Sequence, residues 1–317
     1  MTAHMPASPA KPLSAQSTTA QAISPWVYVR LVLVAFLWGG TFIAGRVVAQ
    51  QVPHLIAAAL RFAMAVPLLL LLAWKMEGGL PRLTRSQLLS TFALGLTGIF
   101  LYNICFFAAL SRMPAGRTAL FVALNPVMTA LFLAMFFRER IGAFKWAGIV
   151  MAFIGAAIII TRGDLAGAWR DITQSIGYGE ALMFCAISAW AGYTIIGRHA
   201  LKGLSPVAAT TYAALWGLLL LGTCAVFEAA AGGPTRFAWH IWAAIAYLGI
   251  FGTVVGFIWY YEGVKAIGPA RTAVFNNLVP VFGILLAALL LSEPVLVSMI
   301  VGGALVIGGV TLTNWQR

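Results

Sequence analysis

Apolar runs of about 20 residues recur along the whole chain, and this recurrence constrains the fold more than any other feature. A helix of that length crosses the roughly 30 Å hydrocarbon core of a bilayer, because each residue adds about 1.5 Å. The mean hydropathy of +0.94 is typical of membrane proteins and not of water-soluble domains. We therefore predict an all-α integral membrane protein with ten transmembrane helices, at about residues 31–50, 55–74, 88–110, 116–137, 143–161, 177–197, 205–227, 239–260, 267–291 and 295–313.

The net charge of +12 arises from basic residues scattered in short segments between these runs. No basic cluster or aromatic platform accompanies them, so we expect no nucleic-acid partner. An N-terminus on the inner side places most of the basic residues in the cytoplasm, which predicts that both termini are cytoplasmic. Residues 1–27 are rich in Ala, Ser, Thr, Pro and Gln and are predicted to form a disordered cytoplasmic tail, and residues 314–317 a short cytoplasmic C-terminus.

Two sequence blocks occur twice at nearly equal spacing. "GRTALFVALNPV" (116–127) aligns with "ARTAVFNNLVPV" (270–281), and "WGGTFIAGR" (38–46) aligns with "WAGYTIIGR" (190–198). We predict two copies of a five-helix unit, residues 28–161 and 177–313, joined by an external linker at 162–176. Because five is odd, the second copy enters the membrane from the opposite side, which gives inverted repeats. Two similar halves that exchange conformations can open one site alternately to either side, as carriers do.

These features resemble a known family. The Trp-x-Gly pattern on the first helix of each half, "LRF" in the second helix, and the small-x-x-Ala start of the fourth and ninth helices, with a later proline and a terminal Glu, are similar to EamA-type carriers of the drug/metabolite transporter superfamily. The resemblance covers about residues 28–313. It implies a multi-pass exporter or exchanger of small metabolites, often amino acids, in the bacterial inner membrane. It also implies a central cavity lined by helices 1, 3, 4, 6, 8 and 9.

Prolines and carboxamides stand together within two of the apolar runs. Pro126 and Pro280 lack an amide hydrogen, so each is predicted to kink its helix and to free a carbonyl group four residues earlier. Asn125, Asn276 and Asn277 are predicted to present amides to a substrate. The alternative interpretation is that these amides form hydrogen bonds between helices.

Aromatic residues accompany amides in the third and eighth helices. Tyr102 precedes Asn103, and Phe106 lies one turn further on, so Tyr102 and Phe106 share a helical face. We assign all three to the predicted substrate site. Trp259 and Tyr260 belong either to this site or to an aromatic belt at the membrane interface.

Trp38 and Trp190 lie well inside the first and sixth helices, where each indole N–H needs a cavity or an acceptor on another helix. We assign both to the substrate site. On the same two helices we assign Thr41 and Tyr193 to the substrate site, and Gly40 and Gly192 to close helix approach, kinking or gating.

Arg61 is the deepest cation, about two turns into the second helix. An ionisable residue inside a membrane is a functional candidate. We interpret Arg61 as a residue for structural pairing or gating rather than for substrate contact, with Glu180 as a candidate partner.

Acidic residues are missing from the middle of every predicted span, and the four histidines lie in the tail or near span ends. A membrane proton relay is therefore not supported. No catalytic motif or metal-ligand cluster occurs, so we expect neither an enzyme nor a metal or cofactor. The three cysteines fall within spans and are interpreted as packing residues.

We predict an alternating-access transporter that exports or exchanges small neutral or zwitterionic metabolites, with amino acids, including aromatic ones, as the favoured class. An efflux carrier for drugs, toxic compounds or nucleosides is the alternative. A non-transporting membrane scaffold or an embedded enzyme is a remote alternative of another class. The expected partners are a small-molecule substrate and the lipid bilayer. The sequence does not decide the substrate, the direction, proton coupling, or the choice between monomer and homodimer.

Overall fold

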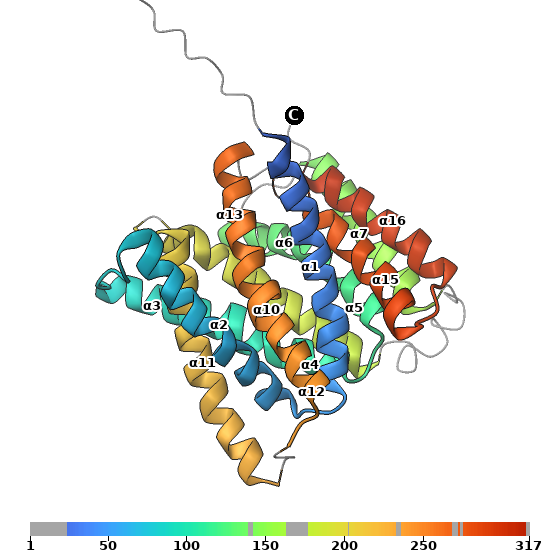
Figure 1. Cartoon of the computed structure of the whole chain (residues 1–317). Helices are drawn as coiled ribbons and strands as arrows, with labels where there is room; N and C mark the ends of the chain where they lie inside the picture. The colour runs from blue at the N-terminus through green and yellow to red at the C-terminus, as the bar shows by residue number, and fades with distance from the viewer. Residues whose placement is uncertain are drawn as a thin grey trace, which may run out of the picture.

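The computed structural model describes residues 24–138, 142–162, 177–201, 203–232, 236–267, 272 and 275–314. All regular structure in these ranges is helical (Figure 1), which confirms the predicted all-α class. Most of the predicted tail and of the predicted linker lies outside the described residues.

The helices of the first half follow one another along the chain. They are α1 (Pro25–Ala49), α2 (His54–Glu77), α3 (Arg85–Leu94), η1 (Gly95–Leu101), α4 (Tyr102–Leu110), α5 (Ala115–Val122), α6 (Asn125–Phe137) and α7 (Ala143–Ile160). Those of the second half are α10 (Tyr178–Ala200), α11 (Pro206–Ala230), α12 (Trp239–Ala246), η2 (Tyr247–Val255), α13 (Gly256–Ile267), η3 (Phe275–Asn277), α15 (Leu278–Leu291) and α16 (Val297–Asn314).

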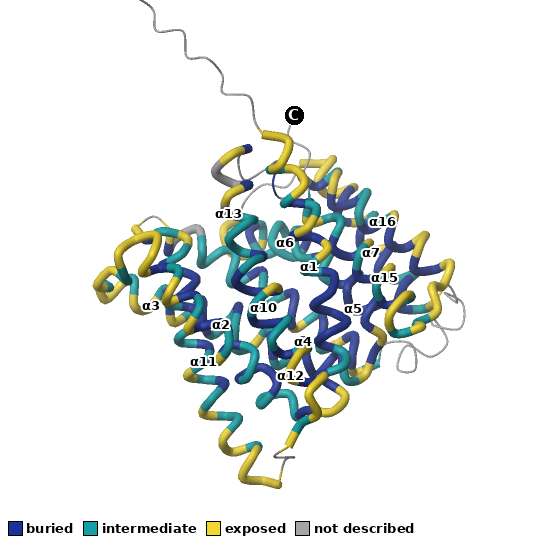
Figure 2. The backbone as a smooth tube through the Cα atoms, viewed as in Figure 1, coloured by how far each residue is buried: buried dark blue, intermediate teal, exposed yellow. Residues whose placement is uncertain are grey.

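Eight helical stretches within the described residues are long and apolar enough to cross a membrane. Two shorter apolar helices, Phe275–Leu291 and Val297–Thr313, accompany them. Large apolar side chains are exposed on the outside, such as Phe227 at 72% and Leu289 at 69%. Figure 2 shows buried residues gathered around α1, α4 and α5 and exposed residues toward the periphery. An apolar exterior of this kind is the surface that a bilayer requires.

The third helix of each half contains a π-helical segment at a matching position. The similar stretches "LGLTG" (94–98) and "LGIFG" (248–252) overlap η1 and η2, with Leu94 as the last residue of α3. A Cβ atom added to Gly95 would lie 2.6 Å from Cβ of Trp216, and one added to Gly249 would lie 3.0 Å from Cβ of Met64. Trp216 and Met64 are themselves matching residues of the two halves. The duplication seen in the sequence therefore recurs in the packing of the helices.

The last helices of the two halves, α7 and α16, pack against each other through glycines (Figure 1). A Cβ atom on Gly155 would lie 2.5 Å from the carbonyl oxygen of Gly302, and one on Gly148 would lie 2.6 Å from that of Gly309. The two backbones can approach this closely only because these positions lack side chains.

The fourth helix of each half is interrupted near its proline. α5 ends at Val122, the next two residues form a turn, and α6 begins at Asn125 with Pro126 in its first turn. In the second half the 3-10 segment η3 leads into α15, which carries Pro280 in its first turn. The predicted kinks therefore coincide with interruptions of the helix, where backbone carbonyls lack their usual helical donors.

Candidate functional site

Trp38 of α1 lies at the centre of an aromatic cluster. Its indole nitrogen donates a hydrogen bond of 3.1 Å to the carbonyl oxygen of Gly252 in η2. Its ring lies 5.5 Å from that of Tyr260 and 6.0 Å from that of Phe257, centroid to centroid, both on α13. The indole thus has an acceptor on another helix, as its position in the span required.

An amide of η3 reaches the same cluster. The side chain of Asn276 adjoins that of Tyr260, although Asn276 is also exposed. Asn277 is half-buried and gives α15 no side-chain cap. Tyr260 is thus part of the cluster, whereas Trp259 makes no ring contact within the described part of the chain.

A second cluster forms around Trp190 of α10. The ring of Trp190 lies 5.1 Å from that of Tyr102 and 5.1 Å from that of Tyr193. Tyr102 stacks on Phe106 at 5.7 Å, which confirms that these two residues share a face of α4. Phe106 is only 1% exposed, so it supports Tyr102 from within the core.

The two clusters occupy matching positions but differ in their partners. Trp38 and Trp190 are separated by 152 residues, as in the aligned blocks. Trp38 packs against Gly256, where an added Cβ atom would lie 2.5 Å from its indole nitrogen. At the matching position of the first half stands Tyr102, which contacts Trp190 instead. The indole N–H of Trp190 has no hydrogen-bond acceptor among the described residues, so this second cluster keeps a polar group available.

Arg61 connects the two π-helical regions. Its Nη1 atom donates to Oδ1 of Asn103 at 3.1 Å, and its Nη2 atom donates to Oγ1 of Thr253 in η2 at 3.3 Å. Asn103 in turn donates to the carbonyl oxygen of Ile99 in η1 at 2.7 Å. Asn103 is 2% exposed, and both ends of its amide are occupied. Asn103 thus holds Arg61 through its carbonyl oxygen and is itself held by η1.

Glu180 forms an ion pair with Arg117, at 2.9 Å between Oε1 and Nη2. The two side chains are 6% and 10% exposed, and Arg117 also donates to the carbonyl oxygen of Ile160. The proposed pairing of Glu180 with Arg61 is therefore wrong, because a buried carboxylate takes the nearest cation that the packing provides, and here that cation is on α5. A polar cavity of about 450 Å³ adjoins the pair, lined by Arg112, Met113, Pro114, Arg117, Ile160, Thr161, Arg162, Gly177, Tyr178, Gly179 and Glu180.

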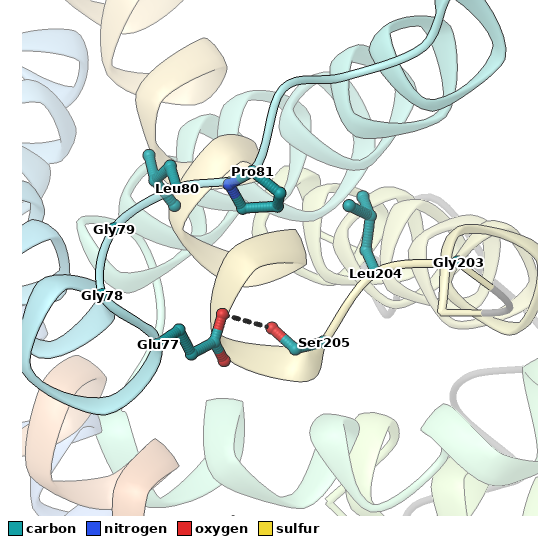
Figure 3. Close-up of a pocket in the computed structure, with 8 residues that line it drawn as sticks. All are labelled: Glu77, Gly78, Gly79, Leu80, Pro81, Gly203, Leu204 and Ser205. Carbon is teal, nitrogen blue, oxygen red and sulfur yellow. Dashed lines mark hydrogen bonds between the residues drawn. The ribbon is translucent and has the colours of Figure 1, made fainter.

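A second cavity, of about 340 Å³, lies where the α2–α3 loop meets the start of α11 (Figure 3). Glu77 accepts a 2.8 Å hydrogen bond from the Ser205 hydroxyl across it. Tyr212 donates to the carbonyl oxygen of Pro81 at 2.6 Å nearby. Neither cavity is lined by a residue of the two aromatic clusters, and the contacts around this one serve to join the loops of the two halves.

The two glycines assigned to close approach or gating differ in their surroundings. Gly40 lies directly against the hydroxyl of Tyr247, which donates to the carbonyl oxygen of Leu37 at 2.9 Å. A Cβ atom on Gly192 would meet only a methyl group of Thr97, at an ordinary 3.7 Å. A side chain at position 40 would meet the Tyr247 hydroxyl, whereas position 192 has room for a methyl group.

Two further predicted residues differ in whether their side-chain hydrogen-bonding groups are already used. The hydroxyl of Thr41 donates to the carbonyl oxygen of Trp38 at 2.6 Å, within its own helix. The Oδ1 atom of Asn125 is buried and accepts no hydrogen bond from the described residues. Asn125 thus brings an unused acceptor to the break between α5 and α6.

Residues on η2 and α13 were missed by the sequence reasoning. Gly252, Thr253 and Phe257 all contact predicted site residues, and Tyr247 fills the space beside Gly40. The signal that could have found η2 is the repeat of "LGLTG" as "LGIFG". Nothing in the described part of the chain gathers three His, Cys, Asp or Glu residues as a metal site would need.

Comparison with known proteins shows which family the chain belongs to. The model of the EamA-like transporter family matches residues 25–161 and, a second time, residues 177–315. The chain belongs to this family of transporters. The resemblance inferred from the repeated motifs is therefore confirmed.

Individual relatives agree with the family. The chain is 30% identical to "Uncharacterized transporter YyaM" of Bacillus subtilis, over 90% of this chain and 92% of that protein. It is 28% identical to the "Probable terminal-alkyne amino-acid exporter" of Streptantibioticus cattleyicolor, over 69% of this chain and 71% of the exporter. A solved structure described as "Crystal structure of protein" matches with a TM-score of 0.59 and 19% identity, over 91% of this chain and 97% of that one. The last match shows a shared fold.

In this EamA-like transporter, each aromatic cluster contains residues from both matches to the family model. Trp38 comes from the first match and Tyr260 from the second, while Tyr102 comes from the first and Trp190 from the second. The clusters therefore lie where the two repeats meet.

Proposed function

We propose that this transporter is an alternating-access carrier that exports or exchanges small metabolites with an aromatic or other apolar part, amino acids above all. One observation carries the proposal: each aromatic cluster joins the two repeats, through Trp38 with Tyr260 and through Tyr102 with Trp190. A rocking motion of one repeat against the other changes both clusters at once. Such a motion couples the binding of a solute between the clusters to a change in access.

The proposal includes ten membrane crossings in two inverted five-helix repeats, at about residues 28–161 and 177–313, with residues 162–176 as an external linker. The eight long apolar helical stretches and the two shorter apolar helices support this number. The matching contacts of Gly95 and Gly249 support two halves that are packed alike. Exchange between two equivalent shapes is what inverted repeats provide in carriers.

We also propose that both termini lie in the cytoplasm and that the protein resides in the bacterial inner membrane. The distribution of basic residues supports this orientation. The bacterial transporters to which the chain is similar support the location.

The polar groups near the clusters support a small solute with hydrogen-bonding capacity. The indole N–H of Trp190 and the hydroxyl of Tyr102 have no hydrogen-bond partners among the described residues. Asn276 is exposed and adjoins Tyr260. Flat aromatic faces bind apolar or aromatic parts of a solute, and the few polar groups fix its orientation. The name of one relative, an amino-acid exporter, is consistent with this class.

Counterflow in proteoliposomes tests the proposal. Liposomes loaded with unlabelled solute receive the same solute in radiolabelled form, over a panel of amino acids, nucleosides and cationic dyes. We expect aromatic and branched amino acids to exchange faster than in liposomes without protein. Exchange of dyes or nucleosides alone would favour drug or nucleoside efflux, and no exchange by folded protein would contradict a carrier.

The amides of η3 give a matched pair of variants for the site. Asn276→Leu removes a polar neighbour of Tyr260, whereas Asn277→Leu removes an amide that makes no hydrogen bond to the described residues. We expect Asn276→Leu to change the preference among exchanged solutes more than Asn277→Leu does. Unchanged preferences in both variants would remove these amides from the site.

A further inference from the structure

Arg61 is a cation inside the bundle for which the described chain provides no carboxylate. All five described acidic side chains are engaged elsewhere. Glu77 accepts from Ser205, Glu180 pairs with Arg117, Glu228 accepts from the amide of Ile56, Glu262 pairs with Arg30, and Glu293 accepts from the amides of Ala115 and Gly116. A cation in a membrane interior without a counter-charge is costly and is rarely kept for packing alone.

The guanidinium of Arg61 also has unused donors. A guanidinium carries five N–H groups, and two hydrogen bonds of Arg61 are to neutral partners, Asn103 and Thr253. Its Nε atom is buried and has no partner among the described residues. These neutral contacts hold the side chain in place without cancelling its charge, so the charge is available to a ligand.

Both hydrogen-bond partners of Arg61 are sequence neighbours of residues in, or bonded to, the aromatic clusters. Thr253, which it contacts, follows Gly252, the acceptor of the Trp38 indole. Asn103, which it also contacts, follows Tyr102, the ring partner of Trp190. A solute whose apolar part lies on these rings can therefore place a charged end at Arg61.

We propose that Arg61 binds the carboxylate of the transported solute, so that the site selects monocarboxylates with an apolar or aromatic part, amino acids among them. This inference rests on the proposed transport function. The planar guanidinium matches a carboxylate in two parallel hydrogen bonds, and the bound anion supplies the counter-charge that the described chain lacks. The neutral contacts to Asn103 and Thr253 fix the guanidinium in advance of binding.

The experiment compares acids with their amides. Counterflow of radiolabelled L-phenylalanine and L-leucine is challenged with two analogues of phenylalanine. 3-Phenylpropanoate keeps the ring and the carboxylate but lacks the amino group, and L-phenylalaninamide keeps the ring and the amino group but lacks the carboxylate. In the wild-type protein we expect 3-phenylpropanoate to compete and L-phenylalaninamide not to compete. Equal competition by both compounds would overturn the inference.

Variants of Arg61 separate binding from architecture. We expect Arg61→Gln to raise the concentration of L-phenylalanine for half-maximal exchange by about 30-fold or more, as loss of a buried charge partner does. Arg61→Lys keeps the charge without the planar fork, so we expect an intermediate effect. The matched control is Arg85→Gln, which removes an exposed arginine at the start of α3 and is expected to leave exchange unchanged.

A readout that does not depend on transport completes the test. The unfolding temperature of the purified protein is measured without 3-phenylpropanoate and at concentrations of it that increase in 10-fold steps. We expect the acid to stabilise the wild type and not Arg61→Gln, because binding to the folded state raises its stability. If Arg61→Gln lowers stability and reduces the exchange rate of all solutes equally, Arg61 has a structural role and the inference fails. If acids stabilise the protein but no solute exchanges, the carboxylate site stands and the proposed transport fails.

Discussion

The indole nitrogen of Trp38 lies 3.1 Å from the carbonyl oxygen of Gly252 and donates a hydrogen bond to it. This bond ties α1 to the π-helical segment η2, and thus joins the two repeats. Its counterpart Trp190 has no such acceptor among the described residues and faces Tyr102 instead. The N–H of one tryptophan therefore joins the two repeats, while the N–H of the other makes no hydrogen bond to the described chain.

This difference predicts that the same substitution affects stability at one position and exchange at the other. Trp38→Phe leaves the carbonyl oxygen of Gly252 without its donor and should lower the free energy of unfolding by about 1 kcal/mol. Trp190→Phe loses no hydrogen bond to the described chain and should leave stability nearly unchanged while weakening exchange. Thermal unfolding and counterflow of the two variants, measured side by side, check both parts. A larger loss of stability in Trp190→Phe would contradict the assignment.

The buried ion pair of Arg117 and Glu180 predicts a large effect of breaking it from one side. Glu180→Gln leaves the Arg117 cation buried without a counter-charge and should destabilise the fold by about 3 kcal/mol or more. The double variant Arg117→Met with Glu180→Leu removes both charges and should be closer to the wild type. Unfolding midpoints of the single and double variants measure this. A double variant that is less stable than Glu180→Gln would show that the pair stabilises the fold by itself.

Glu293 replaces a conventional cap on α5. Its carboxylate accepts from the amides of Ala115 at 2.8 Å and Gly116 at 3.0 Å, where Pro114 provides no side-chain cap. Glu293→Gln removes the negative charge at this helix N-terminus, and we expect a loss of about 1 kcal/mol in unfolding free energy. Glu77→Gln, at an exposed position, is the control and should have a smaller effect. Equal effects would argue against a capping role.

The glycine contacts of α7 and α16 predict which positions tolerate alanine. Gly155→Ala would place a methyl group against the backbone of Gly302 and should destabilise the fold by about 1–3 kcal/mol. Gly192→Ala meets only ordinary contact, and Gly222→Ala meets nothing within 4 Å, so both should fold normally. Yield of monodisperse protein and unfolding temperature provide the comparison. A well-folded Gly155→Ala variant would show that the two helices can separate.

Much of the fold is predictable because apolar length and duplication are properties of the chain itself. Interruptions at Pro126 and Pro280 follow from the missing amide hydrogen, and the stacking of Tyr102 on Phe106 follows from helical spacing. These features depend on residues close together in sequence.

The partners of Arg61 were not predictable in the same way. They lie on helices that are 42 and 192 residues away along the chain, and their selection depends on how those helices pack. The pairing of Glu180 with Arg117 likewise depends on the placement of α10 beside α5. Periodicity defines the face of a residue on its own helix but does not define the neighbour opposite that face.

Labelling of a cysteine at position 276 tests the central claim, that a site between the repeats is opened to either side in turn. Asn276→Cys is made in a protein whose three native cysteines are replaced by serine, and a membrane-impermeant maleimide is added to vesicles of either orientation. Because Asn276 is exposed yet adjoins Tyr260, we predict labelling from both sides, slowed on both by L-phenylalanine. Labelling from one side only, or at a rate that L-phenylalanine does not change, would contradict the account.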